Sequence, residues 1–328
     1  MFCKKISKCL IIILIFFGIY FLKFDKHYPS DINLKAPDNF WGLTFSTKYS
    51  KELGLDYKEV YAAILEDLNI KNIRLPIYWD QIEKVEGIFD FSIYDELIEQ
   101  SKDYNISYII NIGWRLPRWP ECHAPDWVGQ NVKEKTLIML REVVNHYKDY
   151  NNVIAWQIEN EPLLDTFGIC PDGDEEFLKK EIELVKNLDD RDIIISASGE
   201  LSSWKRESKL ADIFATTLYR VVWNEWFGYF RYPLPAKFYS LKAKFNKKDN
   251  VIISELQLEP WVPNNGKINN LLLEEKNKSL NLEQMKANLQ FSINTDFKQA
   301  YLWGVEWWYY EKLNNNHIFW DFIKDNLR

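Results

Sequence analysis

Hydrophobic residues in this chain gather in short runs that are separated by longer amphipathic stretches. Eight runs have the length of a strand, at residues 41–45, 72–77, 107–112, 153–158, 192–197, 213–218, 251–254 and 299–303. Runs that are apolar almost throughout are typical of strands covered on both faces, as in parallel sheets. The pattern therefore predicts a mainly parallel sheet.

Amphipathic stretches with helix-start signals fill the gaps between these runs. Asp56 and Asn131 each begin a capping-box pattern ahead of an amphipathic run, and Ser92 is placed to cap a helix that continues through Ile98. Further helices are expected at residues 202–210, 280–294 and 314–327.

The regular alternation of strands and helices favours one fold class. Eight alternations without a second kind of segment predict an α/β fold, a closed (β/α)8 TIM barrel forming a single domain over residues 40–328. An open doubly wound sheet is disfavoured, because the chain has only 12 glycines and neither a GxGxxG motif nor a phosphate loop.

The first residues form a separate segment. Lysines precede an apolar run at residues 10–22, which is typical of an export signal. Because no small-residue cleavage site follows, residues 1–24 favour an uncleaved signal anchor over a cleaved signal peptide, and a buried helix of a cytosolic protein is the third reading. Residues 25–39 would be a linker, and the domain would be exported, either membrane-anchored or secreted.

Charge and aromatic content narrow the class of partner. The net charge of −7 disfavours nucleic acid, which calls for a clustered basic face. The chain has 14 Trp, 18 Tyr and 20 Phe. Such an excess is typical of a sugar-binding cleft in which flat rings stack on pyranoses, although a Trp-rich core would also account for it.

Two glutamates stand where apolar runs end. The run at 153–158 leads into Glu159, Asn160, Glu161 and Pro162, and the run at 251–254 leads into Glu255. In a barrel, active groups gather at the carboxyl ends of the strands. One protonated and one ionised carboxyl in a shared site indicate glycoside hydrolysis. Glu161 is favoured over Glu159 because Pro162 marks the end of the strand.

These two segments carry a family resemblance. Trp156-Gln-Ile-Glu-Asn-Glu-Pro162 and Ile253-Ser-Glu255 resemble the acid/base and nucleophile signatures of the retaining glycoside hydrolases of clan A, which include the family 5 cellulases. The resemblance extends over residues 40–328, and no single family is assigned. It implies cleavage of O-glycosidic bonds in a β-linked oligosaccharide or polysaccharide by double displacement.

The resemblance also implies roles for individual residues. Glu161 corresponds to the general acid/base, Glu255 to the nucleophile and Asn160 to the partner of the sugar 2-hydroxyl. Arg74, on the second predicted strand, corresponds to the arginine that keeps the nucleophile ionised. A guanidinium beside one carboxyl would distinguish the two glutamates, because it favours the charged form of its neighbour.

Other residues are candidates for substrate contact. Trp303 corresponds to the tryptophan under the sugar in the −1 subsite, and Tyr219 to a tyrosine that binds the nucleophile, with a packed tyrosine as the alternative. Glu306 is expected to bind substrate hydroxyls or to form a salt bridge. Trp79 and Trp114 are expected to stack on sugar.

The remaining chemistry is restricted by cysteine and histidine. Cys122 and Cys170 follow successive predicted strands, and an exported domain would join them as a disulfide or leave two free thiols. With four histidines and no HExxH motif, neither a metal nor another cofactor is expected, and no GxSxG motif supports Ser/His/Asp catalysis.

Two other functions use the same barrel. A non-catalytic carbohydrate-binding barrel would keep the cleft, and a transglycosylase would keep the site but transfer the sugar to another sugar. In every case the expected partner is a carbohydrate, with no nucleic acid, a membrane contacted only through the N-terminal anchor, and a monomeric chain.

Overall fold

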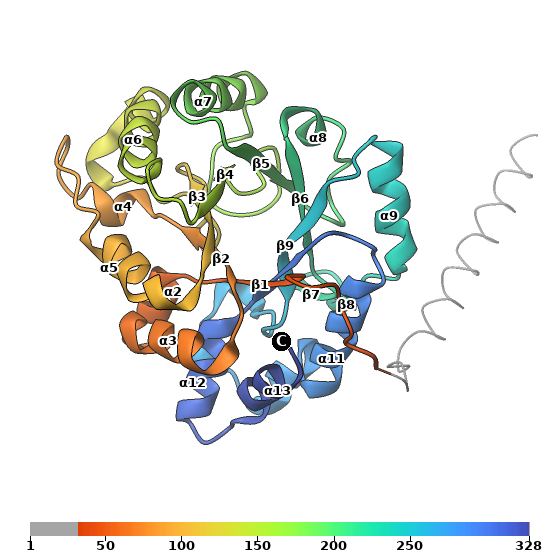
Figure 1. Ribbon diagram of the computed structural model, residues 1–328. Helices are drawn as coiled ribbons and strands as arrows, with labels where there is room; N and C mark the ends of the chain where they lie inside the picture. Colours follow the sequence, from red (N-terminus) through yellow and green to blue (C-terminus); the bar gives the residue numbers. More distant parts are fainter. Residues whose placement is uncertain (1–31, 328) are drawn as a thin grey trace, which may run out of the picture.

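The computed structural model describes residues 32–327, which form a closed barrel (Figure 1). Its eight parallel strands are arranged in the order β1-β10-β9-β6-β5-β4-β3-β2. They are β1 (Trp41–Thr44), β2 (Asn72–Pro76), β3 (Ser107–Ile112), β4 (Val153–Ile158), β5 (Asp192–Ala197), β6 (Ile213–Leu218), β9 (Val251–Gln257) and β10 (Ala300–Trp303). The predicted α/β barrel is confirmed.

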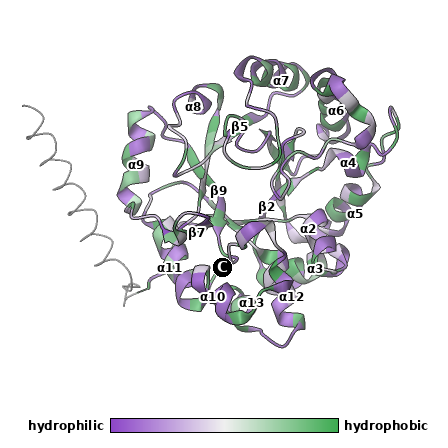
Figure 2. Ribbon diagram, turned by 180° about the vertical axis from the view of Figure 1, so that it is seen from behind, coloured by the Kyte–Doolittle hydropathy of each residue, from purple (hydrophilic) through white to green (hydrophobic). Residues whose placement is uncertain are grey.

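Helices surround the barrel (Figure 1). They are α2 (Thr47–Glu52), α3 (Tyr57–Ala63), α4 (Trp79–Ile82), α5 (Ser92–Gln100), α6 (Val132–Tyr147), α7 (Glu175–Leu188), α8 (Glu207–Leu210), α9 (Ala236–Phe245), α10 (Leu273–Ser279), α11 (Leu282–Ile293), α12 (Val305–Leu313) and α13 (Ile318–Asn326). Figure 2 shows hydrophilic and hydrophobic residues on the same helices, as expected for amphipathic helices that cover a barrel.

One of the three predicted helix caps is confirmed. The Asp56 side chain accepts a hydrogen bond from the backbone of Lys58 at the start of α3. Asn131 makes no side-chain cap bond, because it ends a 3-10 turn that leads directly into α6. Ser92 is the first residue of α5, and Asp90 accepts its backbone N–H instead.

The N-terminal predictions concern residues whose structure is not described. The signal anchor or signal peptide at residues 1–24 lies outside the described residues, as does the first part of the linker. Among residues 32–327, no helix is both long enough and apolar enough to cross a membrane.

The barrel interior has two layers. The apolar layer consists of Ile109, Ala155, Ile194, Ala215, Ile252 and Tyr301. Alternate residues of a strand face the same side. Two positions further along the same strands, the buried residues are polar at five of the six places: Asn111, Gln157, Ser196, Thr217 and Ser254. This polar layer leads into the carboxyl ends of the strands, where the predicted site residues lie.

Candidate active site

Arg74 lies at the centre of the polar layer and is fully buried. Its Nη1 donates to Glu255 Oε1 at 3.0 Å and its Nε to Gln157 Oε1 at 2.7 Å. Its Nη2 donates to Asn111 Oδ1 at 3.0 Å and to Asn160 Oδ1 at 2.8 Å. Only the planar fork of a guanidinium offers this many donors in fixed directions. Arg74 thereby connects four strands or strand ends around one carboxyl group.

Glu255 is held at both of its oxygens. Arg74 binds Oε1, and the hydroxyl of Tyr219 donates to Oε2 at 2.8 Å. The pKa of Tyr219 is raised well above its ordinary value, mainly by burial and also by the charge of Glu255, so the phenol keeps its proton and remains a donor. A cation and a neutral O–H donor both complement a carboxylate anion.

Glu161 follows β4 and has a different environment. Thr217 Oγ1 donates to its Oε1 at 2.9 Å, and its own backbone N–H donates to Ser196 Oγ at 2.9 Å. Burial raises the pKa of Glu161 to about 8, and the charge of Glu255 adds to the shift. A carboxyl with this pKa is protonated at neutral pH, whereas the bonds to Glu255 suit an ionised group.

The strand register brings the two glutamates to the same place. Thr217 on β6 pairs with Glu255 on β9 across the sheet, while its side chain binds Glu161 from β4. The predicted pair of strand-end glutamates therefore converges on one threonine. The two glutamates are far apart in the sequence, but β4, β5, β6 and β9 follow one another as neighbours in the barrel.

Glu159 is turned away from this pair. Its carboxylate accepts the backbone N–H groups of Trp114 and Arg115. It packs so closely on Gly113, which has φ +139°, that a Cβ there would lie 2.5 Å from the Glu159 carboxyl carbon. Glu159 and Glu161 have φ values of 57° and 45°. These left-handed conformations bend the strand end and separate two side chains that a regular strand would place on one face.

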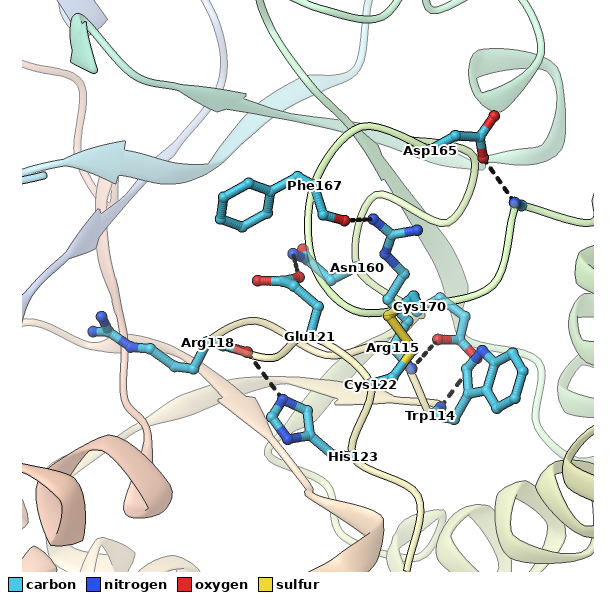
Figure 3. Close-up of a disulfide and its surroundings, with 12 residues drawn as sticks. Trp114, Arg115, Arg118, Glu121, Cys122, His123, Asn160, Asp165, Phe167 and Cys170 are labelled. Atoms are coloured by element: carbon cyan, nitrogen blue, oxygen red, sulfur yellow. Dashed lines mark hydrogen bonds between the residues drawn. A yellow bond between two sulfur atoms is a disulfide. The ribbon is translucent and has the colours of Figure 1, made fainter. Parts of the chain in front are cut away.

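Asn160 has its amide oriented by charge. Its Oδ1 faces Arg74, so its Nδ2 faces Glu121, whose Oε2 accepts at 3.3 Å (Figure 3). Glu121 was not predicted as a site residue. It is buried, and its pKa is raised well above the ordinary value by burial first and then by the charges of Glu255 and Glu161.

A disulfide fixes the loop that carries Glu121. Cys122 and Cys170 are bonded, with Cα atoms 5.5 Å apart, and join the loop after β3 to the loop after β4 (Figure 3). Of the two predicted states of Cys122 and Cys170, a disulfide or two free thiols, the structure contains the disulfide.

Arg118, in the same loop, was also missed. It forms ion pairs with Glu259 and, at 3.0 Å, with Glu306. Its Cζ lies 3.5 Å from the ring centroid of Tyr49 and 3.8 Å from that of Trp303. Of the two roles predicted for Glu306, binding of substrate hydroxyls or a salt bridge, the structure shows the salt bridge. Trp303 is only 5% exposed.

The two tryptophans predicted to stack on sugar lie elsewhere. Trp79 is fully buried in the hydrophobic core, where its Nε1 donates to Glu83 Oε2 at 2.6 Å. It has no free face for a sugar, so its prediction is corrected. Trp114 is half-buried against the core, and in Figure 3 its ring points away from Glu121 and Asn160. Within residues 32–327, no group of three or more His, Cys, Asp or Glu side chains is arranged to hold a metal ion.

Comparison with known proteins gives sequence and structural matches. The β-galactosidase BgaA of Clostridium cellulovorans is 23% identical over 171 residues, which cover 44% of this chain and 26% of that enzyme. The β-galactosidase LacZ of Lactobacillus acidophilus is 22% identical over 153 residues, covering 40% of this chain and 23% of that enzyme. The chain thus spans about a quarter of the length of these relatives.

Two solved structures share the fold. The cold-adapted β-galactosidase of Rahnella sp. R3 has a TM-score of 0.51 at 13% identity, covering 83% of this chain and 52% of that chain. A psychrophilic family 10 endo-β-1,4-xylanase has a TM-score of 0.51 at 15% identity, and the match covers 80% of this chain and 85% of that chain. The family model described as cellulase (glycosyl hydrolase family 5) matches residues 36–213, more than half of the chain. The chain therefore belongs to the cellulase family, glycosyl hydrolase family 5, and with it to clan A of the glycoside hydrolases.

Proposed function

We propose that the protein is a retaining β-glycosidase in which Glu161 is the general acid/base and Glu255 the nucleophile. The observation that carries the proposal is the contrast between the two carboxyl groups. Glu255 accepts hydrogen bonds from a guanidinium and a phenol. The Glu161 carboxyl is buried near Glu255, and burial together with the charge of Glu255 raises the pKa of Glu161 to about 8. Retaining hydrolysis needs one carboxyl of each kind.

The first step uses both protonation states at once. Glu161 gives its proton to the glycosidic oxygen as that bond breaks, and Glu255 Oε forms a bond to the anomeric carbon. The sugar is then an ester of Glu255, and the negative charge on Glu255 is gone. Because that charge contributed to the raised pKa of Glu161, the pKa falls when the ester forms. Glu161, now ionised, is suited to take a proton from the water that hydrolyses the ester.

Asn160 is placed to bind the sugar next to the reacting carbon. Arg74 holds its Oδ1, so Nδ2 is the end left to face the substrate. One Nδ2 hydrogen goes to Glu121, and the other is available for the 2-hydroxyl. A hydrogen bond at that hydroxyl strengthens as positive charge develops on the ring in the transition state.

The comparisons and the disulfide support the class of substrate and the compartment. The relatives named as β-galactosidases and the structure named as a β-1,4-xylanase favour a β-linked sugar. Since disulfides persist in oxidising compartments, the Cys122–Cys170 bond supports an exported domain.

Hydrolysis of a panel of nitrophenyl β-glycosides tests the proposal. The wild-type chain is expected to release nitrophenol from at least one sugar, with a product that keeps the β configuration when observed by NMR. Glu255→Ala should lose activity by at least about 10⁴-fold, by the scale of losses for catalytic nucleophiles. Azide should rescue Glu255→Ala with formation of an α-glycosyl azide and Glu161→Ala with formation of a β-glycosyl azide.

Two results would overturn it. An inverted product from the wild-type chain would exclude double displacement. Sugar binding without hydrolysis across the panel, unchanged in Glu255→Ala, would favour the non-catalytic carbohydrate-binding barrel.

A further inference from the structure

We propose that Arg118 and Glu259 close the glycone side of the site and recognise the hydroxyls of a single terminal sugar, so that the enzyme releases sugars from chain ends. The inference rests on the proposed function and adds to it the mode of action on a polymer. Four observations carry it: a bridge between several loops, its position, its unpaired polar atoms, and an exposed aromatic path that begins at Tyr219.

The bridge is made by one side chain. Arg118 extends from the loop after β3 and contacts Tyr49 on α2, Glu306 on α12, Glu259 after β9, and Trp303 at the end of β10. These partners follow β1, β9 and β10, which are neighbours in the barrel. Arg118 is buried; its two Nη atoms pair with two carboxylates, and its guanidinium lies over two ring faces. Such a contact is part of the packed structure and does not yield easily to a substrate.

The position of the bridge determines what it blocks. The resemblance places the sugar of the −1 subsite against Trp303, yet the guanidinium of Arg118 lies 3.8 Å from this ring, and the indole is 5% exposed. A polysaccharide that continued past the −1 sugar over β10 and β1 would have to displace Arg118. A single sugar between the two glutamates and the bridge would not.

The bridge also presents unused hydrogen-bonding atoms. Arg118 Nε is buried without a hydrogen-bond partner among the described residues. Glu259 Oε2 is also buried and forms no bond of good geometry, although the Trp303 side chain is close enough to the Glu259 carboxyl to lower its pKa. Leaving a buried donor or acceptor unpaired is costly, and such atoms call for an explanation. A donor and an acceptor on two ion-paired side chains match the hydroxyls of a sugar, each of which both accepts and donates. A terminal sugar has hydroxyls at the positions where an internal sugar carries the next linkage.

A path of aromatic rings begins at Tyr219 and becomes more exposed along its length. Tyr219, which binds Glu255, contacts the ring of Trp261 with centroids 5.6 Å apart. Trp261 lies 5.9 Å from Phe167, and Phe167 lies 6.1 Å from Trp119. Exposure rises along this path to 36% at Phe167 and 42% at Trp119.

This aromatic path lies where a leaving group would go. Phe167 belongs to the loop that follows Glu161, the residue that protonates the leaving oxygen. Exposed rings are suited to stacking on sugars without fixing their number or linkage. The inference therefore assigns the leaving group to the exposed aromatic path and the terminal sugar to the buried, charged bridge.

Digestion of labelled oligosaccharides tests the inference with the full chain. The probes are pentasaccharides of β-1,4-linked glucose, mannose, xylose and galactose, each with a fluorescent amine at the reducing end. For the sugar that is hydrolysed, the first labelled product is expected to be the tetrasaccharide, and methylation of the terminal 4-hydroxyl should reduce the rate by at least about 100-fold. Early appearance of shorter labelled products, or unchanged cleavage of the methylated probe, would overturn the inference.

Variants separate recognition from structural support. Glu259→Gln keeps the shape of the side chain and should raise KM for the nitrophenyl glycoside about tenfold or more, on the scale of a hydrogen bond to a charged group, with less effect on kcat. Arg118→Ala should raise KM by a similar factor. It should also reduce the difference in cleavage rate between the unmethylated and the methylated pentasaccharide. A loss of thermal stability with unchanged KM and unchanged discrimination would show a purely structural role and would contradict the inference.

The control is an arginine outside the site. Arg191 lies before β5, pairs with Asp189 and donates to the backbone of Lys148 and Tyr150. Arg191→Ala should change neither KM nor the product pattern. If no nitrophenyl glycoside is hydrolysed by the wild-type chain, the proposed function fails; if hydrolysis occurs but at internal bonds, only the inference about chain ends fails.

Discussion

The two layers inside the barrel are built by the same strands from residues only two positions apart. The apolar layer has isoleucine, alanine and tyrosine side chains, and a pocket of about 350 Å³ opens beside it at the amino-terminal end of the strands. The polar layer surrounds Arg74 and leads to Glu161 and Glu255. One layer leaves space unfilled, whereas the other buries charge at close contact.

This difference shows how the barrel divides its tasks. Small and branched apolar residues in the lower layer stabilise the barrel without requiring specific partners. The upper layer positions buried polar groups in fixed directions, which stabilises little on balance but places a guanidinium at Glu255 and raises the pKa of the buried Glu161. Substitutions in the two layers should therefore have opposite consequences for activity and stability.

Arg74→Lys should have the largest effect, because it acts on the centre of the polar layer. A lysine cannot reproduce the four hydrogen bonds to Glu255, Gln157, Asn111 and Asn160. We expect kcat/KM on the best nitrophenyl glycoside to fall by about 10³-fold, as when a preorganised donor is removed from an active site. Arg191→Lys is the control, and an equal loss in both variants would contradict a special role for Arg74.

Ile252→Ala tests the apolar layer. Removing three buried carbons beside the pocket should lower the free energy of unfolding by about 3 kcal/mol, measured by denaturant titration. Because the side chain points into the lower layer, kcat/KM under native conditions should stay within about twofold of the wild-type value. A large loss of activity with intact stability would break the division between the layers.

The pH dependence of activity follows from Glu161. Its pKa is raised from 4.5 to about 8, so the acid form is lost as the pH rises through 8. We expect kcat/KM to fall about tenfold for each pH unit above that value. An unchanged kcat/KM up to pH 9.5 would contradict the assignment of Glu161 as the acid.

The same shift affects stability. Between pH 4.5 and 8 the folded chain holds a proton on Glu161 that the unfolded chain releases, so the free energy of unfolding should decrease as the pH rises through this window. Glu161→Gln, which cannot titrate, should weaken that decrease in denaturant titrations at several pH values.

Thr217→Val should have the smallest effect. The Thr217 hydroxyl donates to Glu161 and lowers its pKa, so removing it should shift the alkaline limb of the kcat/KM profile upward by about half a pH unit, within the strength of one hydrogen bond. The neighbouring Thr216 donates to the backbone of Ala197, and Thr216→Val should leave the limb in place. A downward shift in Thr217→Val would contradict the role of this bond.

Strand positions could be predicted well from the sequence because apolar runs bounded by turn residues have few alternatives. Four strands, β3 to β6, have the predicted bounds. β9 extends beyond the predicted residue 254 to Gln257, since Glu255 and Gln257 are buried polar residues whose partners come from other strands. Hydrophobicity along the chain does not report such partners.

Residues of the site that belong to short strand-end motifs were predicted from the sequence, whereas those in the loop after β3 were not. Arg74, Asn160, Glu161, Tyr219 and Glu255 are brought together as expected. Arg118 and Glu121 were missed because their partners follow other strands and are far away or unmarked in the sequence, although the charged residues among the tryptophans of that loop were a signal. Burial of Trp79 could not be distinguished from exposure, since a core and a cleft use the same side chain.

The β7 (Val221–Asn224) and β8 (Gly228–Arg231) hairpin was also missed. Its strands are short and only half-buried, so they lack the continuous apolar pattern of the barrel strands. The turn that joins them contains Trp226, which is 89% exposed, and Gly228, the first residue of β8, has φ +67°. A glycine after two aromatic residues was the available sign of a hairpin.

Trapping of the covalent intermediate tests the roles of the two glutamates most directly. A 2-deoxy-2-fluoro glycoside with a good leaving group, made with the sugar that is hydrolysed fastest, slows the second step and accumulates the glycosyl-enzyme. Peptide mass spectrometry should find the fluorosugar on Glu255, with no label in Glu255→Gln. A label on Glu161, or full inactivation with the label on any other residue, would contradict the account.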